Sequence, residues 1–405
     1  MQLDASKLRG FGKYPYALGV VVLFVQVALG ILLFATFQEW IPSELGAGDQ
    51  WGGYLLAAYG GSRFLFEAPT GAISDHMERR IGILFGFALM LPAILLMGLA
   101  RDERAFLAFS SMLGFATAFF WPATYAMSAD LYPPERRGKV IGFLNVAQLL
   151  GFGIGALSGA FLVLGPSSAQ FIVAGSAIVL AFLVGVTTLP GYRQVLRPVS
   201  HASRPGLREI ASFRLAWLSS IVLASSIGVA MVVPAIRPFG ENDLGVSFER
   251  LTLALVPAVV VGAALYVPAG HLADRYGRTL PMIAGQFLIV CGLLIAASTG
   301  SVFVAAGAAV ILFAGNVMTV PALNAAVMDL APESHRGSLI GLSVALNGLG
   351  LAMGPALGGI LVGQWGAPGA FRVAAGICAG TGLSVALYRR SHPRLVVPAP
   401  VRDAI

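Results

Sequence analysis

The chain has 405 residues, of which 57% are hydrophobic and only 11% are charged, and its mean hydropathy is +0.82. Soluble domains carry about 25% charged residues, so the composition excludes an ordinary soluble protein. The formal net charge of +7 does not indicate nucleic-acid binding, because the basic residues flank apolar segments and form no single patch. We therefore predict an all-α polytopic membrane protein.

Apolar segments of spanning length recur along the chain, and each must be helical because lipid offers the backbone no hydrogen-bonding partner. The first six predicted spans are 16–37, 51–73, 81–100, 105–129, 139–164 and 169–189. The second six are 214–236, 251–272, 280–299, 301–328, 339–362 and 368–388. The first span exceeds the apolar core of a signal peptide, so we expect no cleavable signal.

The placement of Lys and Arg predicts the orientation of these spans. Most of the 26 basic residues lie in the terminal segments, in residues 190–213 and in the loops that follow even-numbered spans. On the opposite side lie Arg101, Arg104, Arg237, Arg250 and Arg372. The positive-inside rule therefore predicts a multi-pass protein of the plasma or inner membrane with both termini in the cytoplasm.

Residues 190–213 interrupt the series of spans. They contain the polar and basic stretch GYRQVLRPVSHASRPGLREI, which proline and glycine punctuate. We predict a cytoplasmic linker here. The predicted organisation is an N-terminal six-helix bundle (1–189), the linker (190–213), a C-terminal six-helix bundle (214–390) and a cytoplasmic tail (391–405).

The second half of the chain repeats the first in one ungapped register. DLYPPERRGKVIG (130–142) corresponds to DLAPESHRGSLIG (329–341) at an offset of 199 positions. Other coinciding pairs are Pro69 and Pro268, Gly71 and Gly270, Asp75 and Asp274, Arg79 and Arg278, and Gly155 and Gly354. This indicates a duplicated six-helix unit in the same orientation, that is, a parallel repeat.

A loop pattern, G-x-L-A-D-R-x-G-R, lies between the second and third span of each half. The copy at 270–278 is complete, whereas the copy at 71–79 has His76 and Glu78 where Arg and Gly are usual. With the six-plus-six spans and the basic linker, the chain resembles the major facilitator superfamily, and within it the 12-helix drug/proton antiporter-like group. The resemblance implies 12 transmembrane helices in two six-helix parallel repeats, working by alternating access.

The resemblance also implies a cytoplasmic gate built from the repeated loops. We expect the glycines to allow close helix approach and the aspartates to favour positive helix ends. The alternative is a solvated loop whose charges only set topology. The predicted gate residues are Gly71, Asp75, Arg79, Asp130, Arg137, Gly270, Asp274, Arg278, Asp329 and Arg336.

Two features of that group are altered in this chain. The antiporter signature of the fifth helix reads GFGIGALSGA (151–160), with Ala156 in place of proline, and the better match is GLAMGPALGG (350–359) on the eleventh span. Ser110 stands where the fourth helix usually carries an arginine. These departures count against proton-driven export.

The stretch GSRFLFEAPTGAISDHMERR (61–80) places Arg63 and Glu67 inside an apolar span. Four residues apart, they share one helix face. A charge inside the membrane costs roughly 3 kcal/mol on insertion scales unless it is paired or hydrated. Either the pair lines a water-filled cavity, where Glu67 titrates or Arg63 holds an anionic group, or the two neutralise each other and brace helix packing. Glu67 is our candidate for proton coupling.

Other polar and aromatic side chains also fall within spans. Trp121 and Tyr125 share a helix face, and the repeat relates Tyr125 to Asn324 and Gln148 to Asn347. Symmetry-related polar positions near the midplane predict a substrate cavity, whereas interhelical hydrogen bonds, worth about 0.6 kcal/mol each, are the alternative. The predicted cavity residues are Gln26, Arg63, Trp121, Tyr125, Asn145, Gln148, Asn316, Asn324 and Asn347.

Together these observations predict a secondary transporter that exports a small lipophilic or amphipathic molecule, coupled to protons. One alternative is uptake of an organic anion or sugar anchored by Arg63, and another is a non-transporting membrane sensor on the same fold. An enzyme is not expected, because the spans show no paired carboxylates, His cluster or activated Ser, and the sequence has no Walker A motif. We expect a monomer with no cofactor or metal, whose partners are the substrate, the lipid bilayer and protons, and not nucleic acid.

Overall fold

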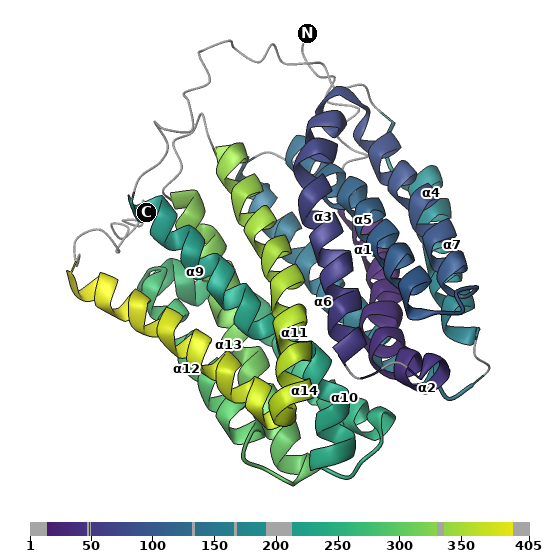
Figure 1. The fold of residues 1–405 in the computed structure, drawn as a ribbon. Helices are drawn as coiled ribbons and strands as arrows, with labels where there is room; N and C mark the ends of the chain where they lie inside the picture. The colour runs from purple at the N-terminus through teal and green to yellow at the C-terminus, as the bar shows by residue number, and fades with distance from the viewer. Residues whose placement is uncertain are drawn as a thin grey trace. The chain divides into compact units, whose positions relative to one another are not determined.

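The computed structural model describes residues 14–46, 48, 50–131, 134–165, 168–191, 213–329 and 336–391. Helices dominate this part of the chain (Figure 1), and no strand occurs in it. Ten of its helical segments are long and apolar enough to cross a membrane. The chain divides into two compact units, Met1–Gly206 and Leu207–Ile405.

The structure has ten such segments among its described residues, whereas the sequence predicts twelve spans, and the numbers differ for two reasons. The helix Gln50–His76, which carries Arg63 and Glu67, has 27 residues but is not among the ten apolar segments. The segment Ala345–Arg390 counts once although its 46 residues exceed the roughly 20 that one span needs, and its backbone breaks at Gly366 with φ 68° and ψ 178°. The predicted 12-helix, two-repeat membrane fold is thereby confirmed.

Unit 1 contains the elements that carry the candidate site. They are α1 (Tyr14–Leu29), the π-helix η2 (Gly30–Trp40), α2 (Ile41–Leu45), α3 (Gln50–His76), α4 (Arg79–Met97), α5 (Glu103–Leu131), α6 (Pro134–Leu162) and α7 (Ala169–Thr188). The first predicted span, 16–37, is therefore part of a longer helical run that widens to π geometry in its second half. Most of η2 is buried, so packing encloses this irregular segment.

Unit 2 has a matching set of helices. They are α9 (Phe213–Ala230), the 3₁₀-helix η3 (Val233–Ala235), α10 (Ile236–Pro238), the π-helix η4 (Phe239–Asp243), α11 (Phe248–Tyr276), α12 (Thr279–Ala296), α13 (Val302–Asp329) and α14 (Arg336–Ser391). The predicted spans 339–362 and 368–388 are both parts of α14. At Gly366 the chain turns and the second part of α14 runs back along the unit (Figure 1).

The order of helix packing is the same in both units. In unit 1, α3 and α4 pack on α5, while α1 packs on α6 and α7. In unit 2, α11 and α12 pack on α13, while α9 packs on α14. Repeated glycines permit the closest approaches: a Cβ at Gly155 would lie 2.2 Å from the Val27 oxygen, and one at Gly354 would lie 2.7 Å from the Ile227 oxygen. The sequence repeat therefore corresponds to a structural repeat.

Candidate functional site

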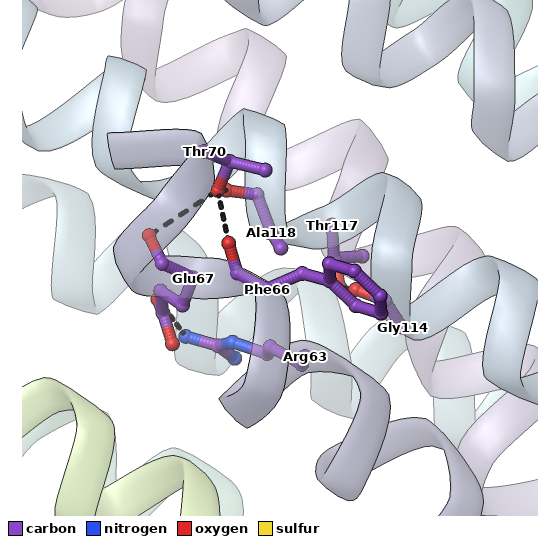
Figure 2. Close-up of polar contacts among 7 residues, drawn as sticks. All are labelled: Arg63, Phe66, Glu67, Thr70, Gly114, Thr117 and Ala118. Carbon is purple, nitrogen blue, oxygen red and sulfur yellow. Dashed lines mark hydrogen bonds and ion pairs between the residues drawn. The ribbon is translucent and has the colours of Figure 1, made fainter. Parts of the chain in front are cut away.

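The candidate site lies where α3 and α5 pack together in unit 1. Two hydroxyl groups join these helices through backbone oxygens. Ser110 Oγ donates to the oxygen of Leu55 at 2.7 Å, and Thr70 Oγ1 donates to the oxygen of Ala118 at 2.6 Å (Figure 2). Small hydroxyl residues at a helix contact allow close approach and supply hydrogen bonds in lipid, so they fix how α3 sits against α5.

Gly114 sets the distance between the two helices. A Cβ built at this position would lie 2.1 Å from the backbone oxygen of Tyr59 on α3. Only a residue without a side chain can therefore occupy this position while the helices keep their spacing. Gly114 lies midway along α5 between Ser110 and Ala118, so a close glycine contact and two hydrogen bonds follow one helix face at spacings of four residues.

Arg63 and Glu67 form an ion pair on α3 (Figure 2). The distance from Arg63 Nη2 to Glu67 Oε1 is 3.2 Å, and the two side chains are 13% and 7% exposed. This pairing is the one that the second hypothesis drawn from the sequence requires, and it is compatible with the first. It explains how the charges are tolerated inside a span, since paired charges avoid much of the cost of an isolated one.

An aromatic pair on α5 lies against the guanidinium group. Arg63 Cζ is 5.6 Å from the centroid of the Trp121 ring, within the range of a cation–π interaction. Trp121 is 2% exposed and stacks on Tyr125, with centroids 5.7 Å apart and an interplanar angle of 27°. The predicted common face of Trp121 and Tyr125 is confirmed. Arg63 thus contacts both the carboxylate of its own helix and the ring face of the next helix.

Several buried polar atoms of this cluster lack a hydrogen-bond partner within the part of the chain that the structure describes. They are Arg63 Nε, Glu67 Oε2, Trp121 Nε1 and Thr124 Oγ1. Such an atom costs roughly 1–3 kcal/mol in a protein interior, and native structures contain few of them. Such atoms also occur at Gln38, Gln170 and Gln286, so they indicate a candidate site only together with the ion pair and the aromatic contacts of this cluster.

Sequence analysis did not single out every residue of interest. Thr124 was missed, although its spacing of three from Trp121 places it on the same face of α5. In unit 2, Gln286 Nε2 donates to Ser225 Oγ at 2.7 Å. This buried contact joins α12 to α9, and nothing in the sequence of either helix indicated it.

The predicted cavity residues Gln26, Asn145 and Gln148 lie elsewhere in unit 1. Gln26 is buried on α1. A Cβ built at Gly151 of α6 would lie 2.9 Å from the Cβ of Gln26. Asn145 and Gln148 are half-buried on α6. The described contacts thus place Gln26 at the seam between α1 and α6, not with the cluster on α3 and α5.

Three further predicted cavity residues belong to unit 2. Asn347 Nδ2 donates to Ser226 Oγ of α9 at 3.1 Å, which is the interhelical hydrogen bond of the alternative reading. Asn316 is half-buried and Asn324 is exposed, both on α13. A substrate role for these residues stays a prediction.

Much of the predicted gate lies outside what the structure describes. It does not describe the side chains of Asp75, Asp130, Arg137, Asp274, Asp329 and Arg336. Arg79 is buried and Arg278 is half-buried. A Cβ at Gly71 would come no closer than 3.8 Å to Pro122, and one at Gly270 would meet no described atom within 4 Å. These two glycines therefore give no close helix approach among the described residues, and the gate stays a prediction.

The sequence matches known proteins over nearly its whole length. The family model described as Major Facilitator Superfamily matches residues 18–224 and 218–404. Multidrug resistance protein 1 of Bacillus subtilis (strain 168) is 24% identical over 337 residues, which cover 82% of this chain and 86% of the relative. Multidrug resistance protein MdtH of Salmonella choleraesuis (strain SC-B67) is 26% identical over 371 residues, which cover 89% and 87%.

Solved structures share the same fold. A bacterial homolog of the human lysosomal transporter Spinster, in an inward-facing and occupied conformation, has a TM-score of 0.79 and 15% identity over 96% of this chain and 99% of its own. The human organic anion transporter MFSD10 has a TM-score of 0.69 and 18% identity over 93% and 99%. Family match, repeat and membrane helices agree: the chain belongs to the Major Facilitator Superfamily and is a secondary transporter, not an enzyme.

Proposed function

We propose that this transporter exports a small lipophilic or amphipathic molecule in exchange for protons, by alternating access of its two six-helix units. The observation that carries the proposal is the buried cluster on α3 and α5, in which Arg63 contacts both Glu67 and Trp121. The two bacterial relatives are both multidrug resistance proteins by name, which supports export.

Glu67 is the proposed proton-binding group. One of its oxygens accepts from Arg63, and the other has no partner among the described residues. A proton on this carboxylate would remove the charge that holds Arg63 in place, because the ion pair would lose one of its members. Protonation would therefore change the position of a residue that also contacts the aromatic pair.

Trp121 and Tyr125 are the proposed substrate contacts. Aromatic faces supply a large apolar area and fixed geometry for lipophilic ligands. The two rings stack along α5, directly beside the ion pair. Proton binding and substrate binding would thus occur at neighbouring groups, so that each could change the affinity for the other.

The orientation, membrane and gate complete the proposal. Both termini would face the cytoplasm and the protein would act as a monomer in the inner or plasma membrane, as the distribution of basic residues predicts. The bundles 1–189 and 214–390 would move as the two alternating units. The charged loop residues of the two repeats would close the cytoplasmic side.

Transport in reconstituted vesicles tests the proposal. Purified protein in proteoliposomes that are acidic inside is expected to accumulate a fluorescent amphipathic dye, driven by outward proton flow. Glu67→Gln is expected to reduce this accumulation to the level of empty vesicles, because an amide cannot take up the proton. The same variant should retain dye exchange at saturating dye without a pH gradient, since that process needs no net proton transfer.

Glu241→Gln is the matched control. Glu241 pairs with Arg237 in unit 2 at the same spacing, with 3.1 Å between the charged atoms, so the substitution removes a paired carboxylate that does not belong to the cluster on α3 and α5. It is expected to leave gradient-driven accumulation intact. Wild-type levels of accumulation by Glu67→Gln would contradict Glu67 as the coupling group.

Uptake of an organic anion anchored by Arg63 is the second candidate function. It is favoured by one observation, the Arg63 Nε that has no described partner and could donate to a carboxylate or sulfonate. Anion transport that requires Arg63 and is insensitive to Glu67→Gln would establish this function in place of export.

A further inference from the structure

We infer that the Arg63 side chain competes with the substrate for one binding site. It occupies the place on Trp121 and Glu67 that a lipophilic cation takes when it binds. The inference rests on the proposed function and deepens it, because it names the substrate class and the residue that sets selectivity. It concerns only α3 and α5, whose mutual position is fixed by described contacts.

The first argument is the identity of the two interactions that Arg63 makes. Its guanidinium group lies 5.6 Å from the centroid of Trp121 and 3.2 Å from the Glu67 carboxylate. An aromatic face beside a carboxylate is the combination that recognises organic cations. The recognition elements for a cationic ligand are thus already assembled, with a side chain of the protein in the ligand's place.

The second argument is the access to the aromatic ring. Trp121 is 2% exposed, while Arg63 lies over its ring and Tyr125 stacks against it. The ring also packs against Phe120, so movement of the guanidinium group would free one of the contacts of the ring for a ligand. The flexible side chain of an arginine can swing aside without a change in the backbone.

The third argument is charge balance, which separates cations from anions. An anion that drew Arg63 away would leave the Glu67 carboxylate buried without a cation, which is strongly unfavourable. A cation that replaced Arg63 would keep that carboxylate paired. Glu67 Oε2, which has no partner among the described residues, is available to accept this second cation. A bound cation thus keeps the carboxylate paired, whereas a bound anion does not, and the displaced guanidinium group must then be hydrated at the end of its flexible side chain.

Proton exchange follows from the same contacts. The proton and the cationic ligand would both bind at the Glu67 carboxylate, so a ligand that binds the protonated form would release the proton to solvent. Arg63 would hold the carboxylate in its charged form between the two events. This gives Arg63 a positioning role, in which it keeps the site closed to ligands that cannot displace it.

Two ions of nearly the same shape and opposite charge provide the test. Tetraphenylphosphonium and tetraphenylborate are measured by equilibrium binding to the purified full chain at a common pH. The key comparison is Glu67→Gln against the double variant Arg63→Met/Glu67→Gln, which differ only in the competitor and leave no unpaired carboxylate. The double variant is expected to bind the phosphonium about tenfold more tightly, the scale of one desolvated cation–π contact.

A third variant tests whether the gain in phosphonium affinity comes from uncovering the Trp121 ring or only from the loss of a positive charge. Adding Trp121→Leu to the double variant should abolish the gain, because the uncovered ring is then missing. Arg237→Met in unit 2 removes an arginine from a similar pair and is expected to leave phosphonium affinity unchanged.

Each outcome decides the matter. A gain for the phosphonium alone that depends on Trp121 supports the inference. Equal phosphonium affinity with and without Arg63, or a gain that survives Trp121→Leu, overturns it while the export function stands. Loss of borate binding on removal of Arg63, with no gain for the phosphonium, would identify an anion anchor and overturn it as well. Failure of the wild-type protein to bind either ion would overturn both the inference and the proposed aromatic substrate site.

Discussion

Replacing Gly114 by alanine is expected to lower the free energy of unfolding by about 2–3 kcal/mol, the upper part of the range for overpacked sites. The new Cβ would lie 2.1 Å from the Tyr59 backbone oxygen, and a backbone atom cannot move aside as a side chain can. The helices must separate, which stretches the hydrogen bonds from Ser110 and Thr70 across the same seam. Thermal unfolding in detergent, followed by the helical signal, measures the loss.

The same substitution at Gly307 is the control. Gly307 lies on α13, the counterpart of α5 in unit 2, and a Cβ there would meet no described atom within 4 Å. Gly307→Ala is expected to raise stability by up to about 1 kcal/mol, because alanine favours the helix more than glycine does. Equal shifts of the two unfolding midpoints would show that α3 and α5 are not in tight contact.

Removal of Arg63 alone is expected to be the most destabilising change in the ion pair. Arg63→Met should lower the free energy of unfolding by about 3 kcal/mol, because it leaves the Glu67 carboxylate buried without its partner. The double variant Arg63→Met/Glu67→Gln should recover most of this loss, since neither remaining side chain is charged. The difference between the single and double variants, measured as unfolding midpoints, isolates the cost of the unpaired charge.

The Arg237–Glu241 pair of unit 2 shows what the loss of an arginine costs in a more exposed ion pair. Glu241 is 35% exposed and can be hydrated when its partner is lost, so Arg237→Met is expected to cost about 1 kcal/mol or less. Additive effects of the two substitutions in the Arg63–Glu67 pair would contradict a buried, mutually dependent ion pair.

The fold could be predicted from the sequence because the membrane imposes few choices. Apolar segments of spanning length must be helical, and a repeat in one ungapped register implies two units of the same structure. The turn at Gly366 falls between the predicted spans 339–362 and 368–388. The π geometry of η2 was not predicted, because it depends on local backbone geometry and leaves no clear trace in a pattern of apolar and polar residues.

The site could be predicted only within single helices. The spacing of Arg63 and Glu67, and that of Trp121 and Tyr125, follow from helical periodicity. The contact between Arg63 and Trp121 joins two helices, so it depends on their register. Gly114 and two hydroxyl contacts set that register, and their importance is visible only when the backbones lie side by side.

Polar residues in spans were the least predictable part. Asn347 forms a hydrogen bond to the neighbouring helix α9, whereas the cluster around Glu67 keeps several polar atoms without a described partner. Both kinds of residue look alike in a sequence, because an amide or a hydroxyl in an apolar span serves packing or binding equally well. Only the hydrogen-bond partners that the structure gives distinguish a residue that serves packing from one that serves binding.

Proton release on ligand binding tests the central claim most directly, namely that Glu67 binds a proton and a cationic substrate in turn. Tetraphenylphosphonium is added to the purified protein in weakly buffered detergent solution, and a pH indicator follows the protons over a range of starting pH. The account predicts that ligand binding to the wild-type protein releases more protons as the starting pH falls and more of the protein carries the proton, and that Glu67→Gln binds residual ligand without releasing any. Ligand binding without proton release from the wild-type protein, or equal release from Glu67→Gln, would contradict it.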